Sequence, residues 1–255
     1  QYVGKYVTMH GFMMTVFDFK EDANTVYRFL GERQFDALVN FSSNLYSEEL
    51  LRLLKDRGTL LVNFANVSDI EVHHDVVGAM LECMEKLRSF GHKKVGYVSV
   101  VDPPRFYADE RGATFSSRRK DFGFDENDDY ILFNDDLARE SGETGYVLTK
   151  RLISAHPEIT ALFVMNDVAA FGAMRALKDL GLNCPADVSV IGCDDILFSR
   201  EYLPSLTSIS FDKEEYGTEI GKRIVNHIQN GEDYSADKYV VKAKAVFRES
   251  AGKCR

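Results

Sequence analysis

Apolar runs that stop at a polar residue alternate with amphipathic stretches along most of this chain. The run Ala161–Met165 stops at Asn166 and is followed by Val168–Leu180, whose apolar residues repeat at helical spacing. The run Val188–Cys193 stops at Asp194 in the same way. A short, continuously apolar run bounded by polar residues is typical of a strand buried on both faces of a parallel sheet. Because ligands bind beyond the carboxyl ends of such strands, the pattern predicts a small-molecule site at these two ends.

The same alternation extends over most of the sequence. We expect strands at residues 13–17, 37–41, 59–64, 94–101, 130–133, 161–165 and 188–193. We expect helices at residues 25–33, 48–57, 77–90, 109–122, 142–155 and 168–180. Strands that alternate with helices of about ten to fifteen residues predict βαβ units and parallel sheets, with helices on both faces.

The alternation breaks after Asp195. Residues 196–211 form an extended stretch with a proline, and a helical pattern at 214–229 and a strand pattern at 238–247 follow. A helix and a strand left over after two βα series can be shared between two lobes, one element to each. In that arrangement the chain crosses between the lobes more than once.

Composition and charge narrow the function classes. With 255 residues and 45% hydrophobic content, the chain can bury a large core, as one domain or two. The formal net charge of −9 argues against operator DNA binding by this chain, because phosphate contacts need clustered Lys and Arg. No apolar run is long enough to predict a membrane span. The first residues also lack the layout of a secretory signal.

The cysteines indicate a reducing compartment. Cys83, Cys184, Cys193 and Cys254 are widely spaced and form no C-x-x-C motif, so they do not support a structural zinc site. Scattered thiols in a chain with an ample core favour the cytoplasm over secretion.

Several motifs together resemble one family. They are L-R-S-F-G-H-K-K-V-G-Y-V, A-D-E-R-G-A-T-F, F-V-M-N-D-V-A-A-F-G-A-M-R-A-L-K-D-L-G, P-A-D-V-S-V-I-G-C-D-D-I, P-S-L-T-S-I and F-R-E-S. In this order they resemble the effector-binding core of the LacI/GalR family of bacterial transcription regulators, in register from about Gly11 to Ser250. Each motif alone is weak, and their combination is specific.

The resemblance implies an α/β, two-lobed, periplasmic-binding-protein-like fold of type I. Each lobe is then a doubly wound, mostly parallel sheet, with a small-molecule effector in a cleft between the lobes. We expect one lobe from residues 1–91 plus 212–233 and the other from 92–211 plus 234–255. The family's helix-turn-helix and first core strand have no counterpart in this sequence. Family members are typically homodimers that repress or activate catabolic genes, and they meet operator DNA through the helix-turn-helix.

Carried over by motif, Arg111, Asn166 and Asp194 fall on the family's ligand-contacting positions. Guanidinium, amide and carboxylate groups together suit a sugar or sugar derivative, because they donate to and accept from hydroxyls. Alternatively, Arg111 and Asp194 pair with each other. We interpret Asp167 as the cap of the following helix rather than a ligand residue, and Asp195 as a loop or cap residue.

Two further residues are weaker ligand candidates. Tyr107 could lay its ring on a sugar face or could be an ordinary exposed tyrosine, and Asp75 could reach the cleft from the first lobe. The sequence also departs from the family pattern at Val76, Thr114 and Cys193, where Asn, Gly and an aromatic residue are usual. These departures bear on the effector's identity and not on the fold.

The sequence offers little support for a metal site, a bound cofactor or an enzymatic activity. His73 and His74 are adjacent, and neighbours on a strand point to opposite faces. The acidic stretch from Asp125 has Tyr130 where a calcium loop requires Gly, so we predict no metal site. No nucleophile elbow, phosphate loop, dinucleotide fingerprint or zinc-protease motif occurs, so we expect no cofactor and no enzyme. The main alternative is a periplasmic sugar-binding protein of a transport system, which has the same fold.

Overall fold

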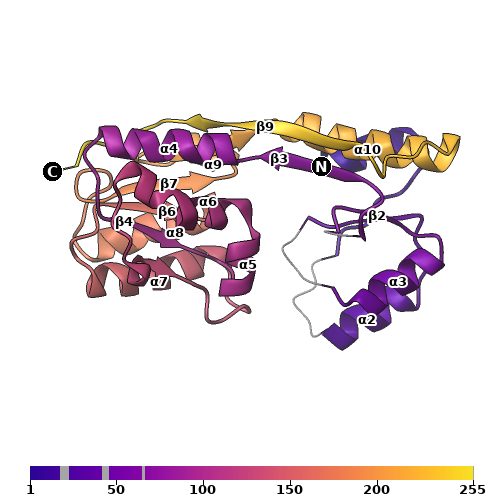
Figure 1. Ribbon diagram of the computed structural model, residues 1–255, viewed down its shortest axis with the longest axis horizontal. Coiled ribbons are helices and arrows are strands. Elements are labelled where there is room, and N and C mark those ends of the chain that lie inside the picture. Colours follow the sequence, from indigo (N-terminus) through magenta and orange to yellow (C-terminus); the bar gives the residue numbers. More distant parts are fainter. Residues whose placement is uncertain (18–22, 42–45, 65–66, 255) are drawn as a thin grey trace. The chain divides into compact units, whose positions relative to one another are not determined.

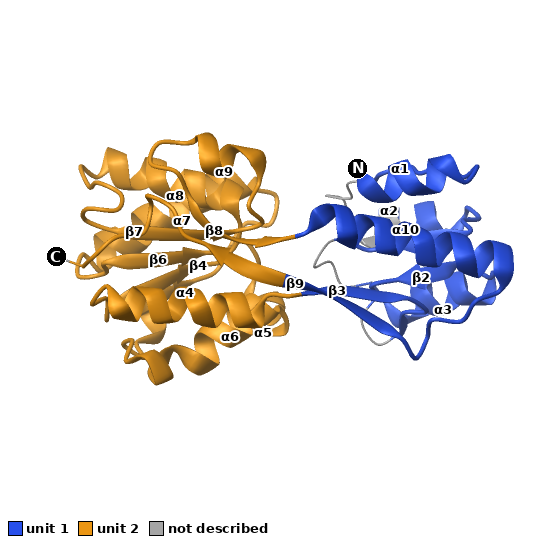
Figure 2. Cartoon of the chain, turned by 90° about the horizontal axis from the view of Figure 1, so that it is seen from above, with its two compact units in different colours: residues 1–74, 212–242 blue, residues 75–211, 243–255 orange. Residues whose placement is uncertain are grey.

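The computed structural model describes residues 1–17, 23–41, 46–64 and 67–254 (Figure 1). By its internal contacts the chain divides into two compact units, coloured separately in Figure 2. Unit 1 comprises residues 1–74 and 212–242, and unit 2 comprises residues 75–211 and 243–255. The chain therefore passes between the units after residues 74, 211 and 242.

Unit 1 combines helices with a short parallel sheet. Its elements are α1 (Tyr2–Met9), α2 (Ala23–Gly31), β1 (Ala37–Val39), α3 (Glu48–Asp56), β2 (Leu60–Val62), β3 (Glu71–Asp75, which ends across the boundary), α10 (Lys213–Asn230) and the first half of β9 (Lys238–Val246). Strands β1 and β2 pair in parallel, with Ala37 opposite Leu60. One apolar cluster joins α1 and α10 to this sheet.

Unit 2 is built on a larger sheet. Its elements are α4 (Val77–Ser89), β4 (Val95–Val98), α5 (Pro103–Ala108), α6 (Glu110–Arg118), the 3₁₀ helices η2 (Arg119–Phe122) and η3 (Asp128–Tyr130), β5 (Ile131–Leu132), α7 (Ser141–Ala155), β6 (Ala161–Val164), α8 (Asp167–Asp179), β7 (Ser189–Cys193), α9 (Leu197–Glu201), β8 (Thr207–Phe211) and the second half of β9. The strand order is β9-β8-β7-β6-β4-β5, parallel throughout except between β8 and β9.

Strand β6 shows why the sequence run is continuously apolar. Ala161 and Phe163 pack into the core that holds α4 and α6, whereas Leu162 and Val164 pack into the core that holds α7 and α8. Both faces of the sheet are thus covered by helices, and every side chain of β6 is buried. The predicted α/β fold with mostly parallel strands is confirmed.

The backbones of α7 and α8 approach closely on one face of this sheet. A Cβ added at Gly145 would lie 2.0 Å from the Ala169 carbonyl oxygen, so no larger residue fits there without moving a helix. This contact fixes the first turn of α8 and therefore the residues that precede it.

The division into units differs from the expected lobe boundaries in two places. Residues 75–91 belong to unit 2, because Met80, Met84 and Leu87 of α4 pack in the same core as Tyr97. An amphipathic helix at the end of the first series looks the same in sequence whichever lobe it covers.

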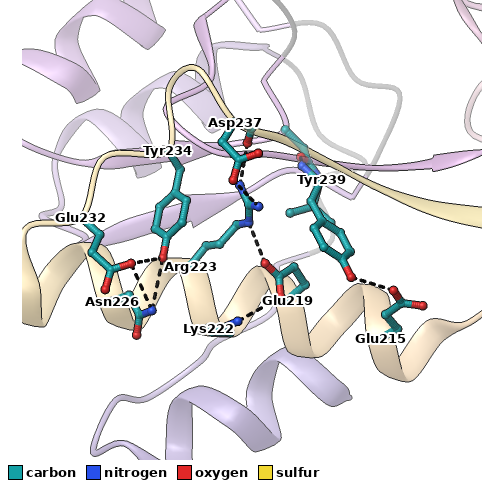
Figure 3. Close-up of polar contacts among 11 residues, drawn as sticks. Glu215, Glu219, Lys222, Arg223, Asn226, Glu232, Tyr234, Asp237 and Tyr239 are labelled. Atoms are coloured by element: carbon teal, nitrogen blue, oxygen red, sulfur yellow. Dashed lines mark hydrogen bonds and ion pairs between the residues drawn. The ribbon is translucent and has the colours of Figure 1, made fainter.

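Residues 234–242 belong to unit 1, because Arg223 of α10 holds them (Figure 3). This arginine is 3% exposed and donates to the Asp237 carbonyl oxygen at 2.6 Å and to Asp237 Oδ2 at 2.8 Å. Its guanidinium also lies over the rings of Tyr234 and Tyr239. A buried cation must keep such partners, so the start of β9 stays with α10.

The strand expected at residues 13–17 is not formed. Met13 and Val16 are exposed, and residues 12–17 have no ladder partner in the part of the chain that the structure describes. They run beside an apolar cavity of about 480 Å³ that is also lined by β1 and α10. An apolar segment forms a strand only where a neighbouring strand pairs with it. Within the described ranges, no helix combines the length and apolarity needed to cross a membrane.

Candidate functional site

Arg111 lies in the first turn of α6 and is held by two partners. Its Nε and one terminal nitrogen donate to the two carboxylate oxygens of Asp109 at 2.8 and 2.7 Å, which is a bidentate pair. The other terminal nitrogen donates to the Met165 carbonyl oxygen at 2.9 Å. Because Met165 follows β6 directly, the guanidinium lies at the carboxyl end of that strand.

This ion pair is partly buried, and each of its charges stabilises the other. Burial alone would raise the pKa of the Asp109 carboxyl, but the hydrogen bonds and charge of Arg111 hold that pKa below its ordinary value. Burial opposes the charge of Arg111, and Asp109 more than compensates, so the arginine pKa is raised. Asp109 is thus a carboxylate partner of Arg111, at 2.7 Å.

Arg111 also reaches the next strand. Burial raises the pKa of the Cys193 thiol to about 12, and the adjacent Arg111 cation works in the opposite direction. Cys193 is the last residue of β7 and directly precedes Asp194. The guanidinium therefore lies between the carboxyl ends of β6 and β7, which are neighbours in the sheet.

Asn166 caps α8. Its Oδ1 accepts a hydrogen bond from the Ala169 amide at 2.8 Å, and its Nδ2 lies 3.5 Å from Ser141 Oγ. The side chain is half-buried at the edge of the sheet. The helix cap that we assigned to Asp167 therefore belongs to Asn166, one residue earlier. The extended φ of −147° at Asn166 allows this, because a cap residue stands just outside the helix.

Asp167 is instead fully buried. Its Oδ2 accepts from the Ile196 amide at 2.9 Å and from Ser199 Oγ at 2.5 Å, and its Oδ1 accepts from Ser208 Oγ at 2.6 Å. Burial raises the pKa of this carboxyl, and these hydrogen bonds offset only part of that effect. Asp167 therefore joins the start of α8 to the segments on both sides of α9.

Asp194 and Asp195 form the turn that follows β7. Both have positive φ values, 108° and 46°, which non-glycine residues seldom adopt. The Asp194 amide donates to the Ile209 carbonyl at 2.9 Å, and the Asp195 carboxylate accepts from Arg248 at 2.6 Å. Asp194 is half-buried at the sheet edge. Asp195 is a loop residue, as expected.

The two weaker candidates lie elsewhere in unit 2. Tyr107 on α5 is 54% exposed and meets the rings of Phe106 and Phe133. Asp75 accepts a hydrogen bond from the Val77 amide at 3.2 Å and so stands at the start of α4. The contacts of Asp75 do not connect it with the Arg111 group.

The structure thus brings Arg111, Asn166 and Asp194 to one edge of the unit 2 sheet. Arg111 joins them through Met165 and Cys193, their immediate neighbours in sequence. Sequence reasoning missed Asp109 and Ser208. An acid two residues before an arginine at a helix start is a detectable signal, and Asp109 is indeed the cap of α6. No local signal marks Ser208, which meets Asp167 only through the fold.

No metal site appears in the described part of the chain, where no group of three or more His, Cys, Asp or Glu side chains is arranged to hold an ion. His73 lies 3.3 Å from Glu71, whereas His74 meets the ring of Tyr216. Asp125, at the start of the acidic stretch, pairs with Lys94. The cysteines, all within residues 67–254, are free thiols.

Comparison with known proteins identifies the family. Residues 84–251 match the periplasmic binding protein-like domain. The chain is 32% identical over 202 residues to the HTH-type transcriptional repressor PurR of Haemophilus influenzae strain PittEE, a match that covers 77% of this chain and 57% of that protein. The chain therefore spans less than two thirds of the length of this relative.

Solved structures share the fold. The complex of the transcriptional regulator CelR with cellobiose has a TM-score of 0.82 at 20% identity, covering 98% of this chain and 76% of that one. A LacI family regulator from Enterococcus faecium with bound ribose has a TM-score of 0.80 at 22% identity, covering 100% and 92%. The chain belongs to the family of periplasmic-binding-protein-like domains, and its resemblance to the effector-binding core of LacI/GalR-type regulators is confirmed.

Proposed function

We propose that this chain is the effector-sensing and dimerisation domain of a bacterial transcription regulator of the LacI/GalR type. Its effector is a small sugar or related metabolite, bound by Arg111, Asn166 and Asp194 at the carboxyl edge of the unit 2 sheet. Effector binding controls how a helix-turn-helix domain, outside these 255 residues, contacts operator DNA. Tyr107 and Asp75 are secondary candidates for ligand contact.

One observation carries this proposal. Arg111 donates to the carbonyl of Met165, directly before Asn166, and its charge acts to lower the burial-raised pKa of the Cys193 thiol, directly before Asp194. Cation, amide and carboxylate are thus gathered at the ends of adjacent parallel strands, where open α/β sheets bind ligands. These groups offer both donors and acceptors, which a polyhydroxylated ligand requires. The regulators of similar fold were solved with cellobiose and ribose.

The relatives also favour regulation over the other function classes. They are named as transcriptional repressors and regulators, not as enzymes or transport components. We therefore assign no reaction and no cofactor to this chain and set aside the transport alternative. In the regulatory role the protein works in the cytoplasm, where operator DNA lies.

Calorimetric titration with D-ribose and cellobiose tests the binding role. We expect the parent chain to bind one of these sugars and Arg111→Lys to bind it at least about tenfold more weakly, because lysine cannot form the bidentate pair with Asp109. Arg119→Lys is the matched control. Arg119 is also buried and bonds the carbonyls of Glu126 and Asn127, away from the sheet edge. A parent chain that binds neither sugar, or an Arg111→Lys chain that binds as the parent does, contradicts the proposal.

A patch of exposed apolar side chains supports the homodimer. It covers α9 and the start of α8 and consists of Val168, Leu197, Phe198, Tyr202 and Leu203. Phe198 is 63% and Leu203 is 85% exposed, and Tyr202 stacks on Phe171 at 4.8 Å between ring centroids. Large apolar side chains exposed on neighbouring elements are typical of protein interfaces.

Sedimentation equilibrium tests the dimer. We expect Phe198→Asp to shift the parent dimer towards monomer, while Leu137→Asp, a control at another exposed apolar residue of unit 2, leaves it dimeric. A parent chain that is monomeric at all concentrations, or a Phe198→Asp chain that dimerises normally, would exclude this interface.

A further inference from the structure

The turn after β7 carries an unfavourable backbone conformation at two successive residues. Asp194 and Asp195 have φ values of 108° and 46°. Residues with a Cβ seldom adopt such a conformation, so it persists only where surrounding contacts enforce it. The residue proposed to meet the effector is therefore held in place by something outside the turn.

A chain of hydrogen bonds leads from this turn to Asp167. The Asp195 amide donates to Ser208 Oγ at 3.1 Å, and the Ser208 hydroxyl donates to Asp167 Oδ1 at 2.6 Å. The next amide in the chain, that of Ile196, donates directly to Asp167 Oδ2 at 2.9 Å. One carboxylate thus fixes consecutive backbone amides immediately after Asp194.

The carboxylate is itself confined. Asp167 has no exposed surface, and Ser199 Oγ also donates to it. A Cβ added at Gly192 would lie 2.3 Å from Asp167 Oδ1, so the strand leaves room for the carboxylate only because this residue is glycine. Asp167 cannot touch an effector, and the helix cap beside it is supplied by Asn166.

We infer that Asp167 is a positioning residue: through Ser208 and Ile196 it holds the left-handed turn that presents Asp194. The importance of Asp194 for the effector rests on the proposed function. The anchoring of the turn rests on the geometry alone, so the two parts can fail separately.

Amide hydrogen exchange tests the anchoring without any ligand. We expect Asp167→Ala to accelerate exchange at Asp195 and Ile196 at least tenfold, and Ser208→Ala to do so at Asp195 with a smaller effect at Ile196. Gly192→Ala keeps the charge but displaces the carboxylate, so it should resemble Asp167→Ala. Asp167→Asn should restore slow exchange at Ile196, because its amide oxygen still accepts from that group.

Asp187→Asn is the control for general destabilisation. The Asp187 carboxylate accepts from the Asn183 amide at 2.7 Å before β7, away from the turn, and exchange at Asp195 and Ile196 should stay at the parent rate in this variant. If Asp167→Ala fails to fold, Ser208→Ala and Gly192→Ala decide the question. Parent-like exchange at Asp195 and Ile196 in both would overturn the inference.

Titration with D-ribose then tests the consequence for binding. If the parent binds, we expect Ser208→Ala to weaken affinity at least threefold and Asp187→Asn to leave it unchanged. Faster exchange with unchanged affinity would overturn the link between the turn and the effector while the anchoring stands. A parent that binds no ribose or cellobiose, together with the expected exchange pattern, counts against the proposed function and not against the anchoring.

Discussion

The carboxyl ends of β6 and β7 look alike in sequence and differ in structure. Each buried strand is followed by two adjacent polar residues, Asn166–Asp167 and Asp194–Asp195. After β6 the backbone enters a long helix at once, so the first residue caps it and the second is buried beneath it. After β7 the backbone makes a left-handed turn before the short helix α9.

The two pairs of residues therefore have different structural roles. After β6, Asp167 accepts hydrogen bonds that hold the β7 turn, and Asn166 caps α8. After β7, the turn is the segment that is held, because Asp195 bonds to Ser208 and to Arg248. We therefore expect loss of the Asp167 carboxylate or of the Asn166 cap to act first on stability and substitutions at Asp194 to act first on affinity.

The largest expected effect is that of Asp167→Ala on stability. The substitution leaves the Ile196 amide and the hydroxyls of Ser199 and Ser208 without their acceptor in a buried site. Unpaired buried donors cost about 1–3 kcal/mol each, partly relieved here by rearrangement of the hydroxyls, so we expect a loss of about 3 kcal/mol. Urea unfolding followed by circular dichroism measures it.

The stability loss of Asp167→Ala is to be compared with that of Asp195→Asn, a substitution in the β7 turn. Asparagine tolerates positive φ, and the ion pair with Arg248 is partly exposed, so we expect a loss below about 1 kcal/mol. Equal losses in the two variants would show that the two strand ends do not differ in role.

The next effect is on affinity. We expect Asp194→Asn to weaken binding of the effector by about tenfold to a hundredfold, because a hydrogen bond to a charged group contributes about 1.5–3 kcal/mol. Asparagine keeps the turn conformation, so the melting temperature should stay close to that of the parent. Titration with whichever sugar binds the parent measures the change. Unchanged affinity would remove Asp194 from the site.

At Asn166 we expect smaller effects, on stability in one variant and on affinity in another. Asn166→Ala removes the cap of α8 and should cost about 1 kcal/mol of stability. Asn166→Asp keeps an acceptor for the Ala169 amide but loses the amide donor, so it should retain stability and lose affinity. Thermal melts and titrations of both variants separate the cap from ligand contact. If Asn166→Asp binds as well as the parent does, Asn166 serves only as a cap.

The fold could be predicted from sequence largely because both faces of the unit 2 sheet are buried. Continuous apolar runs such as Ala161–Met165 mark strands whose two faces meet helices, and that signal is local. The strand predicted at residues 13–17 failed because pairing is not local. The sequence placed the lobe boundary after residue 91, whereas the internal contacts divide the chain after residue 74, because the apolar face of α4 packs in the core of unit 2.

Motif and strand position were enough to propose the site residues, but not to predict their contacts. Which of Asn166 and Asp167 caps α8 depends on a one-residue shift of the helix start, which sequence patterns rarely resolve. The partner of Arg111 is a local residue, Asp109, that was overlooked. The partners of Asp167 lie 29 to 41 residues away and meet it only after β7 and β8 are in register.

The smallest expected effect is a difference in pH dependence between two carboxylates of unit 2, those of Asp109 and Asp167. The pKa of Asp109 is lowered by Arg111 against the opposing effect of burial. Its contribution to stability is therefore present above the unfolded-state pKa of about 3.9 and is lost as the pH falls through the lower folded pKa. Asp109→Asn lacks this contribution, so it should lose stability relative to the parent as the pH rises from about 3 to 6.

For Asp167 the dependence of stability on pH has the opposite sign, because burial raises the pKa of its carboxyl more than the hydrogen bonds lower it. A raised folded pKa favours the protonated form, so this stabilisation is complete below the unfolded-state pKa of about 3.9 and is lost as the pH rises through the folded pKa. Asp167→Asn removes the titration and should gain stability relative to the parent over that same rise in pH. Urea unfolding at several pH values between about 3 and 7 measures both differences. If the two asparagine variants shift in the same direction with pH, the carboxylates share one environment, and the contrast between a paired acid at α6 and an isolated acid beneath the β7 turn is lost.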